Sequence, residues 1–453
     1  MWRKTLVPAL AALLAACKVG PNYHRPNVPA PPQFRFGEMP PSPVSLGDVK
    51  WFDLFQDNAL RNLIGEALKA NYDIRIAAQR IVEAQGQLMV VHSAEYPHVD
   101  AEATTFRYGV SGPSVTTRRV FAFLTWELDV FGKLRRATEA ARADLLATEE
   151  TKVTVLESII AQVAIAYFNL VEYDAEILIV QESIKARQES LALVTARETG
   201  GVASMMDVDQ ARSLVESARS DLVVLERQRS QEEDLISFLL GRAPAPITRG
   251  RILTDQPYPP EVPAGLPSAL LERRPDIRAA EERLVAANAR VGVAKAAFYP
   301  SINLTAAAGV SSSQLVGVAG TTGPAYGYEG IFDLPIFDAG ERAGNYKTAK
   351  AQHQELLLQY LSTIFGAFRD VSDALIAFQK AKEFVATQTA LTDTLRDQNA
   401  LANARWAGGV TSYLEVLDTQ RQFLTSEQLL AQARRDVLTS LVQLYQALGG
   451  GWR

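Results

Sequence analysis

The chain has few side chains that could perform chemistry on a substrate or bind a metal. Its 453 residues include one cysteine and four histidines, and the histidines are scattered at His24, His92, His98 and His353. A zinc site needs several such ligands at close spacing, and the sequence contains no HExxH, Walker, GxGxxG or GxSxG motif. We therefore expect no catalytic residues, no metal and no cofactor, in a protein that is not an enzyme.

The single cysteine, Cys17, lies where a covalent modification is expected. Eleven apolar residues, 6–16, follow a basic start, which suits a secretory signal and is too short to span a bilayer. LAAC at 14–17 resembles a bacterial lipobox, in which signal peptide 1–16 is removed and the cysteine carries lipid. Lys18 follows in place of Asp, which in such lipoproteins implies the outer membrane. The alternative is an ordinary signal peptide that contains a cysteine by chance. We expect no other apolar run long enough for a transmembrane helix.

A second feature is a short stretch that occurs twice. RETGGVAS at 197–204 returns as RWAGGVTS at 405–412, offset by 208 residues. Glycine ends a helix at low cost because it adopts the left-handed conformation, and a serine a few residues later can cap the next helix. Each copy therefore predicts a helix–corner–helix.

The corners belong to a duplicated chain. Four pairs of short sequences recur in order with an offset that drifts only from 203 to 208: Asp73-Ile74-Arg75 with Asp276-Ile277-Arg278, Tyr96-Pro97 with Tyr299-Pro300, Leu128-Asp129-Val130-Phe131 with Leu334-Pro335-Ile336-Phe337, and Leu240-Gly241 with Leu448-Gly449. An ordered series of this kind indicates one large unit present twice rather than a short-period solenoid.

Each half reads as helix, two strands, long helix, corner, helix. The predicted helices are 71–94, 133–199 and 202–240 in the first half and 275–298, 340–407 and 411–448 in the second. Residues 133–199 contain neither Gly nor Pro, so this helix is about 100 Å long. In each half the two shorter helices nearly add up to the long one, which predicts that they stack end to end beside it in a tall antiparallel wall.

The predicted strands are 98–112, 118–131, 301–313 and 326–337. Apolar residues alternate with polar ones, as in Val99, Ala101 and Ala103 against Asp100 and Glu102. Tyr326, Tyr328, Phe332 and Trp126 could supply interfacial aromatics. Four strands do not close a barrel, and open edges are not tolerated in lipid. Several chains are needed, and three would give twelve strands and a passage. The alternative is a soluble β-layer.

Net charge and the proline-rich stretches bear on the class of partner and on the domain boundaries. The net charge of −5 gives no basic footprint for nucleic acid. Proline-rich stretches precede each half. We therefore divide the chain into signal peptide 1–16, anchor with Pro-rich and equatorial segment 17–70, first repeat 71–241, Pro-rich equatorial linker 242–273 and second repeat 274–449, with barrel strands within about 98–131 and 301–337.

At this point the motifs resemble a known family. VGPNY at 19–23 after the lipobox, RPDI at 274–277, AFYP at 297–300, LPIFDAG at 334–340 and GGV at 408–410 look like outer-membrane factor lipoproteins of the TolC/OprM, NodT type, over essentially the whole chain. The resemblance implies a homotrimer with a shared twelve-stranded β-barrel in the outer membrane and a long α-helical tunnel in the periplasm. It also implies a periplasmic adaptor and an inner-membrane pump of the resistance-nodulation-division class, for which the chain would be the passive exit duct of small molecules.

In this family the corners are the periplasmic tips. They meet the adaptor, and the tunnel is narrowest at them. The resemblance assigns docking to Gly200, Gly201, Val202, Ser204, Gly408, Gly409, Val410 and Ser412, and the gate to Leu414, Asp418 and Arg405. The first copy has Met206 and Gln210 at the positions of Leu414 and Asp418, so only the second carries the constriction pattern. The simpler reading is that the acidic residues stabilise helix starts and the arginines stabilise helix ends.

Two other functions stay open. A duct for type I protein secretion would share every one of these features. A non-channel periplasmic coiled-coil lipoprotein would explain the long helices and the anchor, but not strands placed twice at the same end.

Overall fold

The computed structural model of the chain describes residues 18–37, 45–109, 114–259, 262–312 and 323–450. Its contacts define two compact units, each with residues from both halves of the chain. Unit 1 comprises the chain up to Val28, Ala78–Thr151 and Asp276–Thr363, and unit 2 comprises Pro29–Ala77, Lys152–Pro275 and the chain from Ile364. The two long helices, α5 and α9, run through both units.

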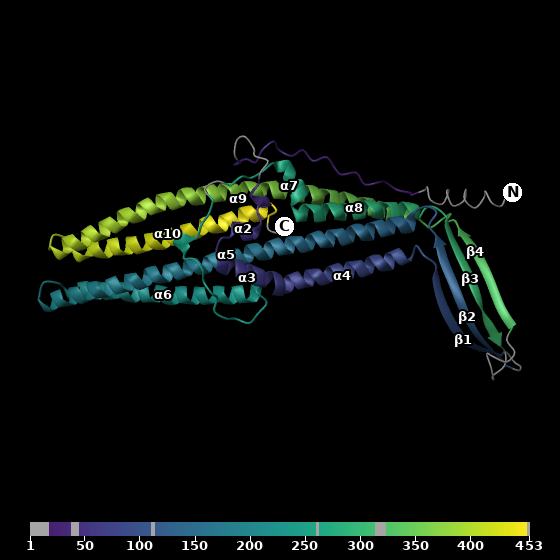
Figure 1. Cartoon of the computed structure of the whole chain (residues 1–453), viewed down its shortest axis with the longest axis horizontal. Helices are drawn as coiled ribbons and strands as arrows, with labels where there is room; N and C mark the ends of the chain where they lie inside the picture. The colour runs from purple at the N-terminus through teal and green to yellow at the C-terminus, as the bar shows by residue number, and fades with distance from the viewer. Residues whose placement is uncertain (1–17, 38–44, 110–113, 260–261, 313–322, 451–453) are drawn as a thin grey trace. The chain divides into compact units, whose positions relative to one another are not determined.

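The order of elements repeats once along the chain (Figure 1). The first half holds η1 (Leu46–Asp48), α2 (Trp51–Leu54), α3 (Asn58–Ala70), α4 (Tyr72–Ser93), β1 (His98–Tyr108), β2 (Val115–Leu128), α5 (Lys133–Thr199) and α6 (Met205–Leu239). The second holds η2 (Leu253–Asp255), α7 (Pro267–Arg273), α8 (Pro275–Ala296), β3 (Ser301–Ser312), β4 (Gly323–Asp333), α9 (Glu341–Ala407) and α10 (Tyr413–Ala447).

The long helices confirm the prediction from Gly and Pro spacing. Both α5 and α9 have 67 residues, and α5 has the bounds expected from the sequence. An aspartate just before each helix accepts hydrogen bonds from its first turn: Asp129 accepts from Leu134 N at 3.0 Å, and Asp338 accepts from Arg342 N at 3.1 Å. An acidic cap satisfies free N–H groups at a helix start, so both halves use the same device to begin their longest element.

The four strands form one antiparallel sheet in the order β1-β2-β3-β4, which Figure 1 shows side by side. Each half contributes one hairpin, and β2 joins β3. The register places Val99 opposite Leu124, Leu124 opposite Ala306 and Ala306 opposite Tyr328. This row lies on one face, because facing residues of paired strands point to the same side.

The same register confirms a sheet with two different faces. Trp126 pairs with Leu304, so both share the face of Leu124, and Phe332, paired with Ile302, lies on that face too. The opposite face carries polar residues, which include Glu102, Thr125, Asn303 and Glu329. An apolar face that continues over four strands is the pattern of a membrane β-sheet.

Within unit 2 the shorter helices meet end to end. Asn71 Oδ1 accepts from Asp73 N at 2.8 Å and so caps α4, while its Nδ2 donates to Leu239 O at the end of α6, also at 2.8 Å. In the second half Arg274 donates to Ala447 O at the end of α10, at 3.3 Å. At the first junction one residue, Asn71, thus satisfies the start of α4 and an open carbonyl of α6, as the predicted stacking requires, and at the second Arg274 supplies the bond to the end of α10.

A polar cluster in unit 2 holds the Pro-rich linker on α5. Asp57 is 2% exposed and accepts from Tyr167 Oη at 2.7 Å, Arg251 N at 2.8 Å and Gln256 Nε2 at 2.9 Å, besides capping α3 through Ala59 N. Tyr167 in turn accepts from Gly250 N at 2.9 Å. Three segments, α3, α5 and the linker, therefore meet at one buried carboxylate, and its hydrogen bonds are what make a buried charge tolerable there.

The structure also differs from the sequence expectations. No helix was expected before residue 71, yet α3 buries Leu60, Leu63, Ile64 and Ala67 on one face, a pattern too short to stand out in sequence. β4 ends at Asp333 rather than 337, since Pro335 has no N–H for a ladder. β2 ends at Leu128 rather than 131, and α6 begins at Met205 rather than 202. The predicted strand ends 112 and 313 lie outside the described residues.

One further expectation needs correction. By length and hydropathy one helix of the described chain, α5, is apolar enough to cross a membrane, although the sequence suggested no such run. Its apolar window is 56% buried within the fold, and residues 159–171 of α5 contribute most of the largest core cluster together with α3. We assign this stretch to the core of the helical unit.

Candidate functional site at the helix corners

The first corner joins α5 to α6 with a reversal built on one left-handed glycine. Gly201 has φ +74°, its N–H donates to Glu198 O at 2.8 Å, and Val202 N donates back to Arg197 O at 2.9 Å. These bonds satisfy carbonyls that a helix end leaves open. The positive φ explains the glycine, because a side chain with a Cβ is strained there.

The second corner repeats this geometry almost atom for atom. Gly409 has φ +73°, its N–H donates to Trp406 O at 3.0 Å, and Val410 N donates to Arg405 O at 2.9 Å. Added Cβ atoms at Gly201 and Gly409 would meet nothing within 4 Å. The glycines are therefore required for their backbone conformation and not for lack of space around them.

The start of the following helix differs between the corners. Ser204 and Asp207 form a capping box: Asp207 N donates to Ser204 Oγ at 3.3 Å and Ser204 N donates to Asp207 Oδ2 at 2.9 Å. Ser412 makes no side-chain cap to α10, so the expectation of a serine cap holds at the first corner and is wrong at the second. There Thr411 hydrogen-bonds Glu415 instead.

An arginine links the two corners within the chain. Arg197, in the last turn of α5, donates to Trp406 O at 3.1 Å and Ala407 O at 2.8 Å, the open carbonyls at the end of α9. Its guanidinium lies 4.2 Å from the centroid of the Trp406 ring. A cation on helix-terminal carbonyls and an aromatic face is favourable on both counts, so Arg197 ties the α5–α6 corner to α9.

The predicted gate residues lie on the exposed side of the second corner. Asp418 accepts from Arg421 at 2.8 Å and Gln422 at 2.6 Å, both one turn on along α10. Arg405 approaches Glu415 across the corner at 3.8 Å. Leu414 is 65% exposed. In the single chain these three side chains do not meet one another, so any constriction they form requires copies of the chain.

A buried cluster beneath the corners escaped the sequence reading. The ring centroids of Trp406 and Tyr413 lie 5.0 Å apart with the ring planes tilted by 50°, and Ser190 Oγ lies 3.0 Å from Tyr413 Oη. Around them pack Val194, Val208, Ala211, Ala402 and Val416 from the four corner helices. The aromatic residues of RWAGGVTSY were the available signal. They make the four helix ends one packed body while Val202 and Val410 above them stay 79% and 70% exposed.

The remaining predicted site, Cys17, lies outside the described residues. Among the residues that are described, no three His, Cys, Asp or Glu side chains gather as a metal-binding group would require.

Comparison with known proteins decides the family. A model of the outer membrane efflux protein family matches residues 63–242 and 266–450. The chain belongs to the outer membrane efflux protein family. This confirms the resemblance drawn from the motifs, the outer-membrane location and the function as an efflux duct.

Curated relatives extend over the whole chain. The cation efflux system protein CusC of Escherichia coli O6:H1 is 33% identical over 454 residues, 99% of each chain. The solvent efflux pump outer membrane protein SrpC of Pseudomonas putida is 34% identical, over 99% of this chain and 98% of its own. The probable outer membrane lipoprotein SilC of Salmonella typhimurium is 32% identical over 97% of each chain.

Solved structures agree with these relatives. The crystal structure of CusC aligns with a TM-score of 0.88 at 31% identity, over 96% of this chain and all of that one. The open state of the MtrE outer membrane channel of Neisseria gonorrhoeae gives 0.88 at 31% identity, over 96% and 99%. The predicted fold class, long helical hairpins with four strands in each chain, is that of outer-membrane efflux channels.

Proposed function

We propose that three copies of this outer membrane efflux protein form one duct that passes small molecules from an inner-membrane pump to the exterior. The observation that carries it is the sheet: β1 and β4 pair only on their inner sides, so each chain presents two open edges. Open edges are excluded in lipid, and three four-stranded sheets joined edge to edge give a twelve-stranded barrel with a passage. The duct conducts passively and has no catalytic step.

The corners are the proposed docking points for a periplasmic adaptor. Gly200–Val202 with Ser204, and Gly408–Val410 with Ser412, form two equivalent turns in each chain, six in the trimer. The exposed Val202 and Val410 offer each adaptor hairpin one apolar contact at an otherwise polar turn. A pump of the resistance-nodulation-division class is the proposed energy source. CusC is named for cations and SrpC for solvents, which favours small molecules over secreted proteins.

Native mass spectrometry tests assembly and anchoring together. The full chain, released in mild detergent, is expected to appear as a trimer whose subunits each begin at an acylated Cys17. Each buried methylene of the lipid adds about 0.8 kcal/mol of membrane affinity, so the anchor supports the barrel without replacing it. A stable monomer would contradict the shared barrel. An unmodified N-terminus elsewhere would contradict the lipid anchor alone.

Asp418 is the proposed gate carboxylate, together with Leu414 and Arg405. In a trimer three copies of Asp418 form a ring, and removing them takes away the ion-pair partner of Arg421, whose side chain is 72% exposed. Asp418→Ala is therefore expected to raise single-channel conductance in a planar bilayer by about twofold and to weaken cation selectivity. Asp393→Ala is the matched control, since Asp393 makes the same kind of exposed pair with Arg396 at 2.6 Å on α9. Equal conductance for wild type and Asp418→Ala would remove Asp418 from the gate.

A further inference from the structure

Arg136, near the start of α5, is buried to an extent unusual for arginine. Its side chain is 1% exposed and is among the largest fully buried side chains of the described residues. A buried guanidinium is stable only when acceptors surround it, because it cannot lose its proton. Neither the efflux function nor the corners require this residue, so its partners identify a separate site in unit 1.

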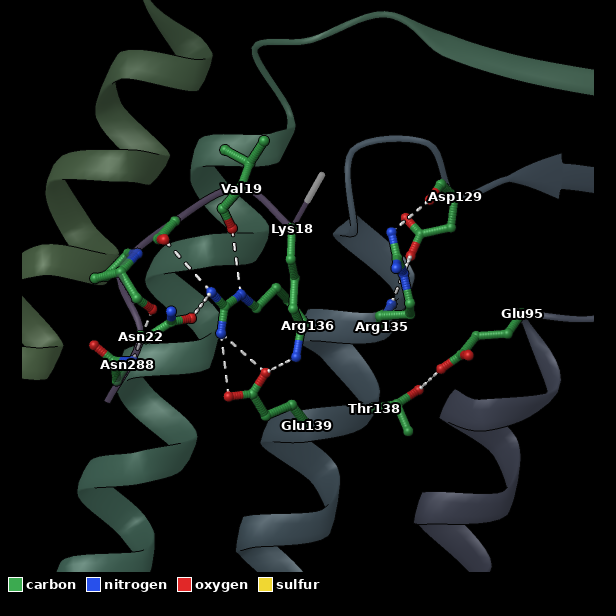
Figure 2. Close-up of polar contacts among 12 residues, drawn as sticks. Lys18, Val19, Asn22, Glu95, Asp129, Arg135, Arg136, Thr138, Glu139 and Asn288 are labelled. Atoms are coloured by element: carbon green, nitrogen blue, oxygen red, sulfur yellow. Dashed lines mark hydrogen bonds and ion pairs between the residues drawn. The ribbon is translucent and has the colours of Figure 1, made fainter. Parts of the chain in front are cut away.

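Most of the acceptors come from the segment that follows Cys17. We call this segment, Lys18–Arg25, the N-terminal strap. Figure 2 shows the Arg136 guanidinium pointing into it: Nε donates to Val19 O at 3.3 Å, and Nη2 donates to Gly20 O at 3.4 Å and to Asn22 Oδ1 at 2.8 Å. Only Glu139, bonded through Nη1 at 3.0 Å, belongs to the same helix as the arginine. The strap therefore shields the guanidinium from solvent and accepts most of its hydrogen bonds.

Each strap residue from Lys18 to Asn22 has a partner. Val19 N donates to Phe131 O at 3.1 Å, three residues beyond the end of β2. Pro21 O accepts from the buried Asn288 of α8 at 3.0 Å, and Lys18 pairs with Glu139. Burial acts to raise the pKa of Glu139, but Lys18 and Arg136 outweigh it and lower the pKa, so the carboxylate stays charged. An unbroken series of contacts fixes the strap residue by residue.

Two glycines allow the backbones to meet. Gly20 has φ +104°, and a Cβ there would lie 2.4 Å from Gly292 Cα on α8. A Cβ on Gly292 would lie 3.0 Å from Arg136 Cδ and Nε. Backbone cannot yield as a flexible side chain can, so a side chain at Gly20 cannot be seated against α8. The strap, α5 of the first half and α8 of the second are thus fitted to one another.

We propose that Arg136, Gly292 and Asn288 form a seat that fixes the N-terminal strap, the segment that follows Cys17 in sequence, beside the end of β2. Arg136 is a positioning residue in this scheme. The seat leaves one residue, Lys18, between the hydrogen bond of Val19 to Phe131 and the cysteine. The functional part of this proposal, a contribution to membrane insertion, rests on the proposed acylation of Cys17. A lipid joined to a free segment samples many positions, whereas a lipid joined to a fixed segment samples few.

The functional consequence is faster productive insertion. Ordering a chain segment costs conformational entropy, and a preformed seat removes that cost from the step in which the sheets enter the bilayer. Loss of the seat should therefore lower the amount of trimer in the outer membrane without changing acylation, because the lipobox lies outside the seat.

Hydrogen exchange of the full acylated chain in detergent tests the seat directly. In the wild type, the Val19 amide, which donates to Phe131 O, is expected to be protected in peptides covering residues 18–25. Arg136→Gln and Gly292→Val should raise their exchange rate by about tenfold or more. Gly20→Val should do the same, and because it lies in the strap it leaves helix packing intact. Arg142→Gln, an exposed arginine of the same helix, is the control and should match the wild type.

Three outcomes decide the matter. Protection of residues 18–25 that survives both Arg136→Gln and Gly20→Val overturns the seat. A released strap with an unchanged trimer level overturns its contribution to insertion. The intact mass of the same samples separates this from the lipid anchor: a protected strap on an unmodified terminus supports the seat and contradicts only the acylation of Cys17.

Discussion

Gly250→Ala is expected to destabilise the helical unit by about 3–5 kcal/mol, a large effect for one methyl group. A Cβ at this position would lie 2.0 Å from Asp57 Oδ1 and 2.6 Å from its Cγ, so the carboxylate must move. Tyr167, Arg251 and Gln256 would then lose their shared acceptor, and each buried group left without a partner costs about 1–3 kcal/mol. Denaturant unfolding followed by helical circular dichroism measures the loss.

Gly65→Ala provides the control for this substitution. Gly65 lies within α3, and a Cβ there would meet nothing within 4 Å. Alanine is the better helix former by about 1 kcal/mol, so this variant should be unchanged or slightly more stable. If the Gly250→Ala and Gly65→Ala proteins unfold at the same denaturant concentration, the proposed importance of the Asp57 cluster is contradicted.

The same cluster predicts sensitivity to acid. Burial acts to raise the pKa of Asp57, but hydrogen bonds from Gln256, Arg251 and Tyr167 outweigh it and lower the pKa. A carboxyl whose pKa is lowered by folding stabilises the fold above its unfolded value, about 4, and loses that contribution as the pH falls through the folded value. In Gly250→Ala these bonds are broken, so acid unfolding should begin at a higher pH than in the wild type.

Glu172→Gln is expected to make the protein more stable, by an amount that grows with pH. Glu172 of α5 is 1% exposed, one turn from Glu176, which is 3% exposed and accepts from Gln432 of α10 at 2.8 Å. Burial first, and then the hydrogen bond and charge of Glu176, raise the pKa of Glu172 to about 9. The neutral acid is therefore the folded form at neutral pH, and a glutamine resembles it.

The groups around this pair do not cancel the effect. On α10, Arg435 lies 3.9 Å from Glu172 and bonds Asp436 at 2.8 Å, so its charge is shared. From the α6 side, Glu232 accepts from Asn169 at 3.2 Å and adds a further carboxyl close by. Arg435 thus faces several acidic groups at once, and ionisation of Glu172 stays unfavourable in the folded state.

The sign follows from proton linkage. Above about pH 4.3 the unfolded chain loses the Glu172 proton while the folded chain keeps it, so wild-type stability falls with pH up to about 9. Glutamine removes this dependence. The stability difference should grow by up to about 1.4 kcal/mol for each pH unit in that window, seen as a rising difference in Tm. Glu189→Gln, an exposed position of the same helix, should show no trend. A constant difference for Glu172→Gln would mean that Glu172 is ionised when folded.

The long helices, the strands and their duplication follow from the sequence alone. The absence of Gly and Pro over residues 133–199 specified α5 to the residue, and Gly201 and Gly409 located both corners. Alternation in the strands predicted the apolar face that the register then showed. These features are local: helix length, turn conformation and side-chain period depend on neighbours within a few residues, so they can be read directly from the chain.

Only the tertiary structure revealed the seat, the Asp57 cluster and the buried Glu172. Arg136 meets Asn22 across 114 residues, Asp57 meets Arg251 across 194, and Gln432 meets Glu176 across 256. In sequence, Arg136 is one of several arginines on a long helix, and Gly250 is one glycine in a Pro-rich linker. Their importance comes from burial and from distant acceptors, which the packing of separate segments decides and no local pattern encodes.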